Sequence, residues 1–268
     1  MKGRTDLIIE LEKDTEKSLF YEENFGQIKV MFSSLEDKND YEKPKGKYAT
    51  VRLGNIEKLT DFRMAEKAII FCLKKLLKNT PKNVLVVGLG NREITSDCIG
   101  PHTAERILAT RHIKGEFAQK VGLEKLKSVS VIEPGVLGKT GIETAETVSA
   151  LVQKIKPDAV IVIDALCAQN AENLFSVIQF CDSGISPGSG VKNTRRELSE
   201  KTLGIPTVAI GVPTVVEADF IKGASCENLL VTPKDADLLS RHISELLAQA
   251  INVFLQPDCD REIILNLV

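Results

Sequence analysis

Long apolar runs and a concentration of charge of one sign are both missing from this sequence of 268 residues. No apolar stretch approaches the roughly 20 residues of a membrane-spanning helix, and the first residues, Met1–Asp6, lack the apolar core of a signal peptide. The formal net charge is only −2, so we expect no surface that binds nucleic acid. These absences predict a cytoplasmic protein whose partners include neither a membrane nor a nucleic acid.

Histidine is also scarce, and the cysteines are not arranged in pairs. The three histidines are too dispersed to form a histidine-rich metal site. The six cysteines contain no CxxC pair, and scattered cysteines in a chain of this size are typical of reduced thiols. The sequence therefore predicts neither a disulfide framework nor a cofactor.

What the sequence does contain is a regular alternation of strands and helices. Because βα alternation favours a parallel sheet covered by helices, we expect an α/β fold, a three-layer sandwich with a mainly parallel central sheet, in a single domain over residues 1–268. The expected strands are Tyr48–Leu53, Val84–Val87, Ser128–Ile132, Ala159–Asp164, Phe175–Phe180 and Pro206–Ile210. The expected helices are Asp61–Leu77, Gly100–His112, Glu143–Ile155 and a last helix with Thr232 as N-cap and Pro233 as first residue.

Two aspartates stand at or just past the carboxyl ends of predicted buried strands. Asp97 follows Val84–Val87 by a short loop, and Asp164 directly ends Ala159–Asp164. The crevice beyond the strand carboxyl ends is where parallel sheets bind ligands. Two carboxyl groups a few ångströms apart do not both ionise easily, so one would keep a proton and the pair could do acid–base chemistry.

Several glycine-containing loops are expected to meet the two aspartates at the same rim of the sheet. Gly88-Leu89-Gly90 follows a strand, but the dinucleotide-binding fingerprint requires a third glycine where this chain has Glu93, so a tight turn near a ligand is the better interpretation. The residues expected to contact a substrate are Gly88, Gly90, Asn91, Gly135, Gly138, Asp182, Gly188, Gly190, Pro213 and Thr214.

Two short patterns invite other chemistries. Asp182-Ser183-Gly184 resembles the catalytic triplet of pepsin-like proteases, but those enzymes are β-rich, so Asp182 is interpreted as a turn former or a residue that lines the site. Cys98 adjoins Asp97, and His102 is close to Cys98 in sequence. Catalysis by a nucleophilic Cys98 with His102 as its base therefore remains an alternative. A lone cysteine near a helix start is more often a small packed side chain.

Segments along nearly the whole chain resemble the spore germination protease family. They are Arg4-Thr5-Asp6-Leu7, Lys43-Pro44-Lys45-Gly46-Lys47-Tyr48, Val87-Gly88-Leu89-Gly90-Asn91, Asp97 with Gly100-Pro101, Pro134-Gly135-Val136-Leu137-Gly138, Ile163-Asp164-Ala165-Leu166, Asp182-Ser183-Gly184-Ile185, Pro187-Gly188-Ser189-Gly190, Leu203-Gly204-Ile205-Pro206 and Gly211-Val212-Pro213-Thr214-Val215-Val216.

This resemblance implies an endopeptidase of endospore-forming bacteria that starts the degradation of small acid-soluble spore proteins at germination, in the spore core. It also implies a fold similar to that of hydrogenase maturation endopeptidases, a homotetramer, and a zymogen with a short amino-terminal pro-segment. The family's proposed catalytic pair matches Asp97 and Asp164. Only Met1–Gly3 precede the Arg4 motif here, which leaves autoprocessing open.

Two alternatives remain beside this interpretation. In the first, the chain is a hydrogenase-maturation-like peptidase in which a metal directs cleavage, with Glu93, Asp97 and His102 as candidate ligands. In the second, it is an inactive relative that only binds a partner protein. Retention of both aspartates argues against the second, because a binding fold does not require them.

Overall fold

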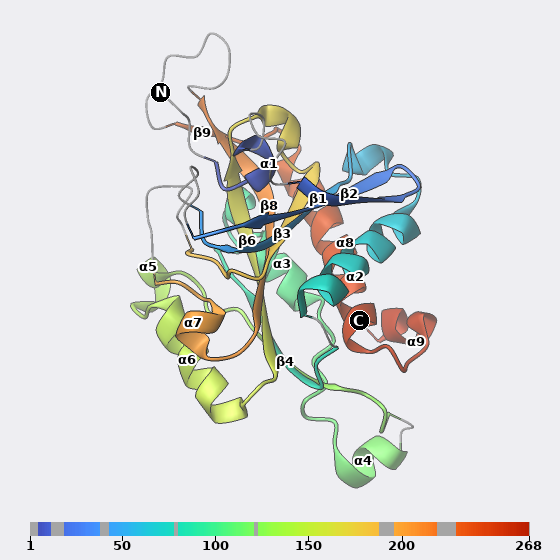
Figure 1. Cartoon of the computed structure of the whole chain (residues 1–268). Coiled ribbons are helices and arrows are strands. Elements are labelled where there is room, and N and C mark those ends of the chain that lie inside the picture. The colour runs from blue at the N-terminus through green and yellow to red at the C-terminus, as the bar shows by residue number, and fades with distance from the viewer. Residues whose placement is uncertain are drawn as a thin grey trace.

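A computed structural model of the chain describes residues 5–11, 19–37, 43–77, 80–120, 123–187, 196–218 and 229–267. Its centre is one mixed sheet whose strands follow the order β1-β2-β3-β7-β8-β6-β4-β5, with β9 paired to β8 (Figure 1). Among these residues, no helix is both long and apolar enough to pass through a lipid bilayer.

The half of the sheet that carries the two aspartates is parallel. It consists of β4 (Asn83–Gly88), β5 (Ser128–Ile132), β6 (Ala159–Ala168) and β8 (Thr207–Glu217). β4, β6 and β8 are buried almost throughout, because β-branched and aliphatic side chains fill both faces. The expected parallel arrangement is therefore confirmed for this half.

The other half of the sheet is antiparallel and comes mainly from the first part of the chain. β7 (Val177–Cys181) joins β8 to β3 (Gly46–Arg52), and beyond β3 lie β2 (Ile28–Leu35) and β1 (Leu19–Phe25). The short β9 (Leu230–Val231) pairs with the end of β8. The β1–β2 hairpin was not expected from the sequence, because its polar and charged residues mask the alternation.

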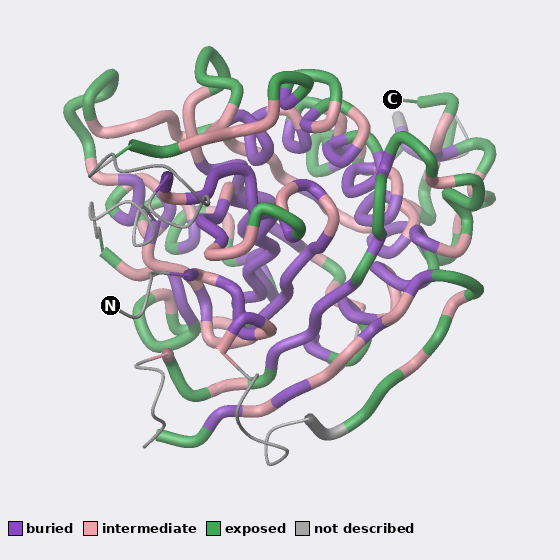
Figure 2. Tube along the Cα trace, turned by 90° about the horizontal axis from the view of Figure 1, so that it is seen from above, coloured by how far each residue is buried: buried purple, intermediate pink, exposed green. Residues whose placement is uncertain are grey.

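Helices cover both faces of the sheet, which confirms the three-layer α/β sandwich. α2 (Phe62–Leu77), α3 (Ile99–Glu105) and α8 (Ala236–Leu255) lie on one face, and α6 (Thr144–Ile155) and α7 (Glu200–Leu203) lie on the other (Figure 1). Figure 2 shows the buried residues concentrated in the middle of the molecule and the exposed ones in peripheral loops. The remaining short helices are α1 (Ile8–Leu11), α4 (Gly115–Lys120), α5 (Leu137–Thr140) and α9 (Arg261–Asn266), with 3-10 turns η2 (Ile56–Lys58), η3 (Thr95–Asp97) and η4 (Ala171–Asn173).

Four of the expected boundaries differ from the structure. The helix expected to be the last is α8, and it begins at Ala236, not at Pro233, because the hydroxyl of Thr232 donates to the Thr214 carbonyl (2.8 Å) instead of capping the helix. α3 ends at Glu105, well before the expected His112. β6 and β8 both run past their expected ends, and this extension carries them along the rim where the site lies.

Candidate active site

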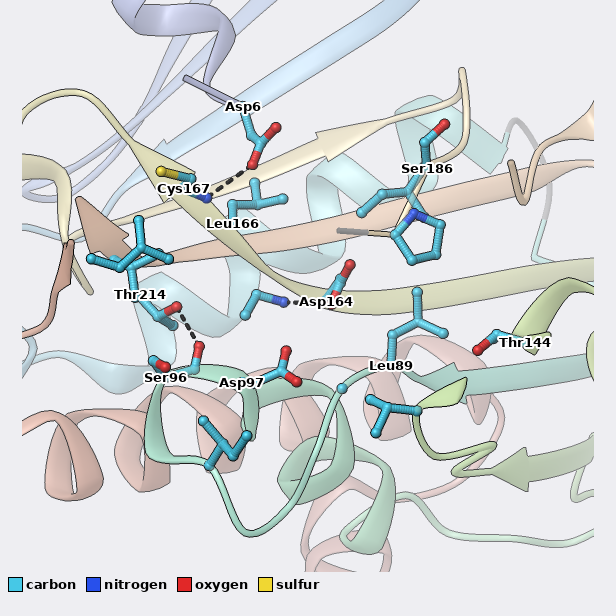
Figure 3. Close-up of a pocket in the computed structure, with 18 of the residues that line it drawn as sticks. Asp6, Leu89, Ser96, Asp97, Thr144, Asp164, Leu166, Cys167, Ser186 and Thr214 are labelled. Atoms are coloured by element: carbon cyan, nitrogen blue, oxygen red, sulfur yellow. Dashed lines mark hydrogen bonds between the residues drawn. The ribbon is translucent and has the colours of Figure 1, made fainter. Parts of the chain in front are cut away.

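A cavity of about 360 Å³ lies at the carboxyl ends of the parallel strands. Its walls come from the turn after β4, from the end of β6, from residues 135–136 with Thr144, from residues 185–187, and from Asp6 near the amino terminus. Both predicted catalytic aspartates line it, and Figure 3 shows Asp164 on β6 and Asp97 on the loop below it. The topology thus brings together two side chains that the sequence separates widely.

Asp97 is held by the loop that follows β4. The backbone N–H of Asn91 donates both to the Asp97 carboxylate (2.9 Å) and to the Asp97 carbonyl (3.0 Å). Gly90 allows this approach, since its φ is +115° and an added Cβ would lie 2.1 Å from the Asp97 carbonyl oxygen. A glycine is therefore required at this turn to set the position of Asp97.

Asp164 is part of β6 and is almost completely buried, with 6% of its surface exposed. Its Oδ1 accepts a hydrogen bond of 2.9 Å from the backbone N–H of Ala165. β4 pairs with β6 only as far as Gly88 and Ile163, so Asp164 is the first β6 residue beyond the end of its neighbour. This end of β4 opens the space into which the carboxyl group faces.

The two carboxyl groups have different environments and so different proton affinities. Burial, and then the charge of Asp97, raises the pKa of Asp164 well above its usual range. Burial also raises the pKa of Asp97, but the hydrogen bond from Asn91 opposes that shift. Of the two acids, Asp164 is therefore the one whose environment more strongly favours the protonated form.

Asp6 is a third carboxylate in the cavity, and it was not among the residues expected there. Its Oδ2 accepts from the backbone N–H of Cys167, and its own N–H donates to the Cys167 carbonyl, both at 2.9 Å. Lys43 Nζ lies 3.8 Å from its other oxygen. The Arg4-Thr5-Asp6-Leu7 motif was the available signal, but no local pattern indicates that the amino-terminal segment folds back onto β6.

The segment around Asp6 is fastened by the buried carboxylate of Glu10. Its two oxygens accept from the backbone N–H groups of Gln169 (2.7 Å) and Asn170 (2.8 Å) and from the side chain of Asn173 (2.7 Å). The Thr5 hydroxyl also donates to it. Because a buried charge is stable only with such partners, Glu10 locks residues 5–11 against the end of β6.

Three of the residues expected to contact a substrate line the cavity, namely Gly90, Gly135 and Thr214. The hydroxyl of Thr214 donates to the Ser96 carbonyl (2.6 Å) and so joins β8 to the turn that carries Asp97. Gly135 has a φ of +73°, which a residue with a side chain rarely adopts.

The other expected contacts lie elsewhere. Gly88 packs against α3, where an added Cβ would be 2.3 Å from the Gly100 carbonyl oxygen. Asn91 contacts Asp97 through its backbone N–H and is not part of the cavity lining. Asp182 accepts from the backbone N–H of Lys47 (2.7 Å), so it fastens the end of β7 to β3 and is not in the cavity lining. Gly138 and Pro213 are also not part of that lining, and Gly188 and Gly190 lie outside the described residues.

The thiol alternative has little support in this geometry. Cys98 is buried, its Sγ donates to the Thr95 carbonyl (3.1 Å), and burial raises its pKa, which disfavours the reactive thiolate. Burial, and then the charge of Asp6, raises the pKa of Cys167 to about 12. The five cysteines of the described segments are all unpaired, as expected of reduced thiols.

The candidate ligands of the metal alternative do not converge. Glu93 pairs with Lys139 (2.6 Å), and only Asp97 of the three lines the cavity. Burial, and then Arg106, lowers the pKa of His102. Within the described ranges, no group of three or more His, Cys, Asp or Glu side chains could hold a metal ion. In the described part of the chain, these three residues therefore do not form a metal site.

Comparison with known proteins yields consistent matches. The family model described as germination protease matches residues 5–227. The chain is 36% identical to a germination protease of Clostridium tetani over 322 aligned positions, covering 98% of each chain. It is 37% identical to that of Caldanaerobacter subterraneus over 308 positions (95% and 94%). It is 49% identical to that of a Geobacillus species over 158 positions, covering 59% of this chain and 42% of the relative.

Among solved structures, the chain is similar to a [NiFe] hydrogenase maturation protease, HycI, from Thermococcus kodakarensis, with 18% identity and a TM-score of 0.40. The match covers 67% of this chain and 97% of that one. This match is too distant to carry an argument. The family model and the two long alignments suffice: the chain belongs to the germination protease family and is a peptidase.

Proposed function

We propose that the chain is an endopeptidase that initiates the degradation of small acid-soluble spore proteins during spore germination, with Asp97 and Asp164 as an aspartic-type catalytic pair. The observation that carries this proposal is the meeting of two carboxyl groups, one from strand β6 and one from the loop after β4, in one cavity of a protease-family fold. We also propose, from the family resemblance alone, a single-domain homotetramer that acts in the spore core.

The chemistry follows from the unequal environments of the pair. Asp97, the less buried acid, takes a proton from a water molecule as that water attacks the scissile carbonyl. Asp164 carries the shared proton, which it donates to the developing oxyanion or to the leaving amine. The backbone N–H groups of Gly90 and Gly135 in the cavity wall are candidates for further stabilisation of the oxyanion.

Removal of either acid tests the mechanism. Asp97→Asn and Asp164→Asn preserve size, and each is expected to lower kcat/KM for a small acid-soluble spore protein by at least about 100-fold, the lower range for loss of general acid–base catalysis. Cleavage is followed by the masses of the fragments, and circular dichroism verifies that each variant is folded.

Asp158→Asn is the matched control for this experiment. Asp158 is an exposed aspartate at the opposite end of the parallel strands, where it accepts from the backbone N–H groups of Lys82 (3.0 Å) and Asn83 (2.9 Å). This variant should cleave at the wild-type rate. Near-normal cleavage by a folded Asp97→Asn or Asp164→Asn chain would eliminate the aspartate-pair mechanism.

A further inference from the structure

The edge of β6 is open beside Asp97 and Asp164. β4 stops pairing with β6 at Gly88 and Ile163, and one last bond comes after it, from the N–H of Leu89 to the Ile163 carbonyl (2.8 Å). β6 itself continues to Ala168 and stays paired with β8 on its other edge. Within the described part of the chain, a stretch of β6 therefore has a neighbouring strand on one side only.

The same edge is closed again farther along by the amino-terminal segment. Both backbone groups of Cys167 are used by Asp6, the N–H by its carboxylate and the C=O by its N–H, each at 2.9 Å. The open stretch is thus bounded by Leu89 at one end and by Asp6 at the other.

Ala165 lies midway, two residues from Ile163 and two from Cys167. Alternate residues of a strand direct their N–H and C=O groups to the same edge, so those of Ala165 face the open stretch. The register shift at this point skips Thr214 and so lies in β8, which leaves the alternation of β6 intact. In this structure the N–H of Ala165 donates to the Asp164 carboxyl group, so a substrate carbonyl would share or replace that bond.

The open stretch and the cavity of the candidate active site are the same space. Leu89, Ala165 and Asp6 all line the cavity, together with Asp97 and Asp164. Figure 3 shows the end of β6 crossing this space with Asp97 facing it from the opposite side. A main chain placed along Ala165 would therefore have a carbonyl within reach of both acids.

We propose that the peptide substrate binds there as an extended strand, in the place that a continuation of β4 would take, with the N–H and C=O of Ala165 as its hydrogen-bond partners. This inference rests on the proposed endopeptidase function. Addition of a strand to an open edge is an established mode of peptide recognition, in which the main chain supplies affinity. It follows that only an extended segment can be cleaved and that the substrate residue opposite Ala165 is recognised through its backbone.

Replacement of single amides by esters in the substrate tests this inference. Ala165→Pro would remove the N–H of the protein, but it would also disturb β6 next to Asp164, so the change is made in the peptide instead. We start from a peptide that the wild-type chain cleaves and make a series of variants. Each variant carries a single ester in place of one amide, either at the scissile bond or at one of the three amides on each side of it. Binding of each peptide to the uncleaving Asp97→Asn variant is measured by fluorescence anisotropy.

The expected pattern follows from the alternation of an extended chain. The ester that deletes the N–H facing Ala165 should weaken binding by about tenfold, the upper range for one hydrogen bond. Esters at the positions immediately before and after it, whose N–H groups point away, should weaken binding less than about twofold. Uniform losses, or no loss at any position, would overturn the inference while cleavage by the wild-type chain still supported the peptidase. If the wild-type chain cleaves no peptide and no spore protein, the proposed function fails and this inference fails with it.

Discussion

At the residue scale, aspartate has a different environment at each of three positions in this chain. Asp164 is buried within a strand, Asp97 is half-buried and accepts a backbone N–H, and Asp182 fastens two strands outside the cavity. Asp97 and Asp182 stand near glycines in the sequence, whereas Asp164 does not. Burial and hydrogen bonding therefore distinguish the proposed proton donor, the proposed base and a structural aspartate.

Asp6 offers a direct test of charge in the site. Its negative charge contributes to the raised pKa of Asp164 but not to that of Asp97. In Asp6→Asn, the pKa of Asp164 should fall, so the alkaline limb of the kcat/KM profile moves to lower pH while the acidic limb stays in place. The amide can still accept from Cys167, which preserves the fold. A uniform loss of activity without movement of the alkaline limb would assign Asp6 a structural role only.

At the scale of elements, Gly88 of β4 and Gly100 of α3 allow the helix to pack closely against the sheet. An added Cβ on Gly100 would lie 2.2 Å from the Leu89 carbonyl oxygen and 2.6 Å from that of Ile163. These are backbone atoms of the turn after β4 and of β6, so they cannot move aside without displacing Asp97 and Asp164. The close contact between helix and strands is therefore part of how the two aspartates are positioned.

Gly100→Ala is expected to lower the free energy of unfolding by about 3 kcal/mol, the upper range for overpacking. The matched control is Gly138→Ala in α5, where nothing lies within 4 Å of an added Cβ. Alanine also favours a helix over glycine, so the control should be neutral or slightly more stable. Urea unfolding of both variants measures the difference, and equal stability of the two would contradict the packing argument.

At the scale of the whole molecule, the site lies where the parallel strands meet the amino-terminal segment. The parallel strands provide Asp97 and Asp164, whereas the amino-terminal segment supplies Asp6 and is clasped by Glu10 against the end of β6. The carboxyl-terminal helix α9 is held in a similar way, since its Arg261 donates to the buried carboxylate of Glu66 in α2 (2.7 Å). Both termini are thus attached to the sandwich through buried carboxylates.

Global stability should carry the signature of the buried Asp164. Its pKa is higher in the folded than in the unfolded chain, so the folded chain binds that proton more tightly. The stabilisation is complete below the unfolded pKa and is lost as the pH rises through the folded pKa. Asn at position 164 does not titrate. The free energy of unfolding of Asp164→Asn, relative to that of the wild type, should therefore increase as the pH rises. Urea unfolding at a series of pH values checks this, and a constant difference would contradict it.

Periodicity and strand-end position were enough to predict most of the parallel half of the fold and the two aspartates. Val84–Val87 and Ala159–Asp164 are short buried runs, and parallel strands direct the loops at their carboxyl ends to one rim. The β1–β2 hairpin was missed because its polar residues obscure the alternation, and the start of α8 was misplaced because Thr232 bonds to Thr214 instead. Local rules hold where a segment is stabilised by its own pattern, and they fail where a distant partner takes the hydrogen bond.

The sequence by itself determined the α/β class, the prediction that Asp97 and Asp164 meet at one rim, and the likeness to germination proteases, because each follows from local runs and motifs. Only the tertiary structure decided that Asp6 joins the cavity, that Asp182 and Gly88 do not, and that Ala165 lies on an open strand edge. It also shows the burial that raises the pKa of Asp164 well above its usual range. These features depend on burial and on contacts between segments far apart in the chain, which no local pattern records.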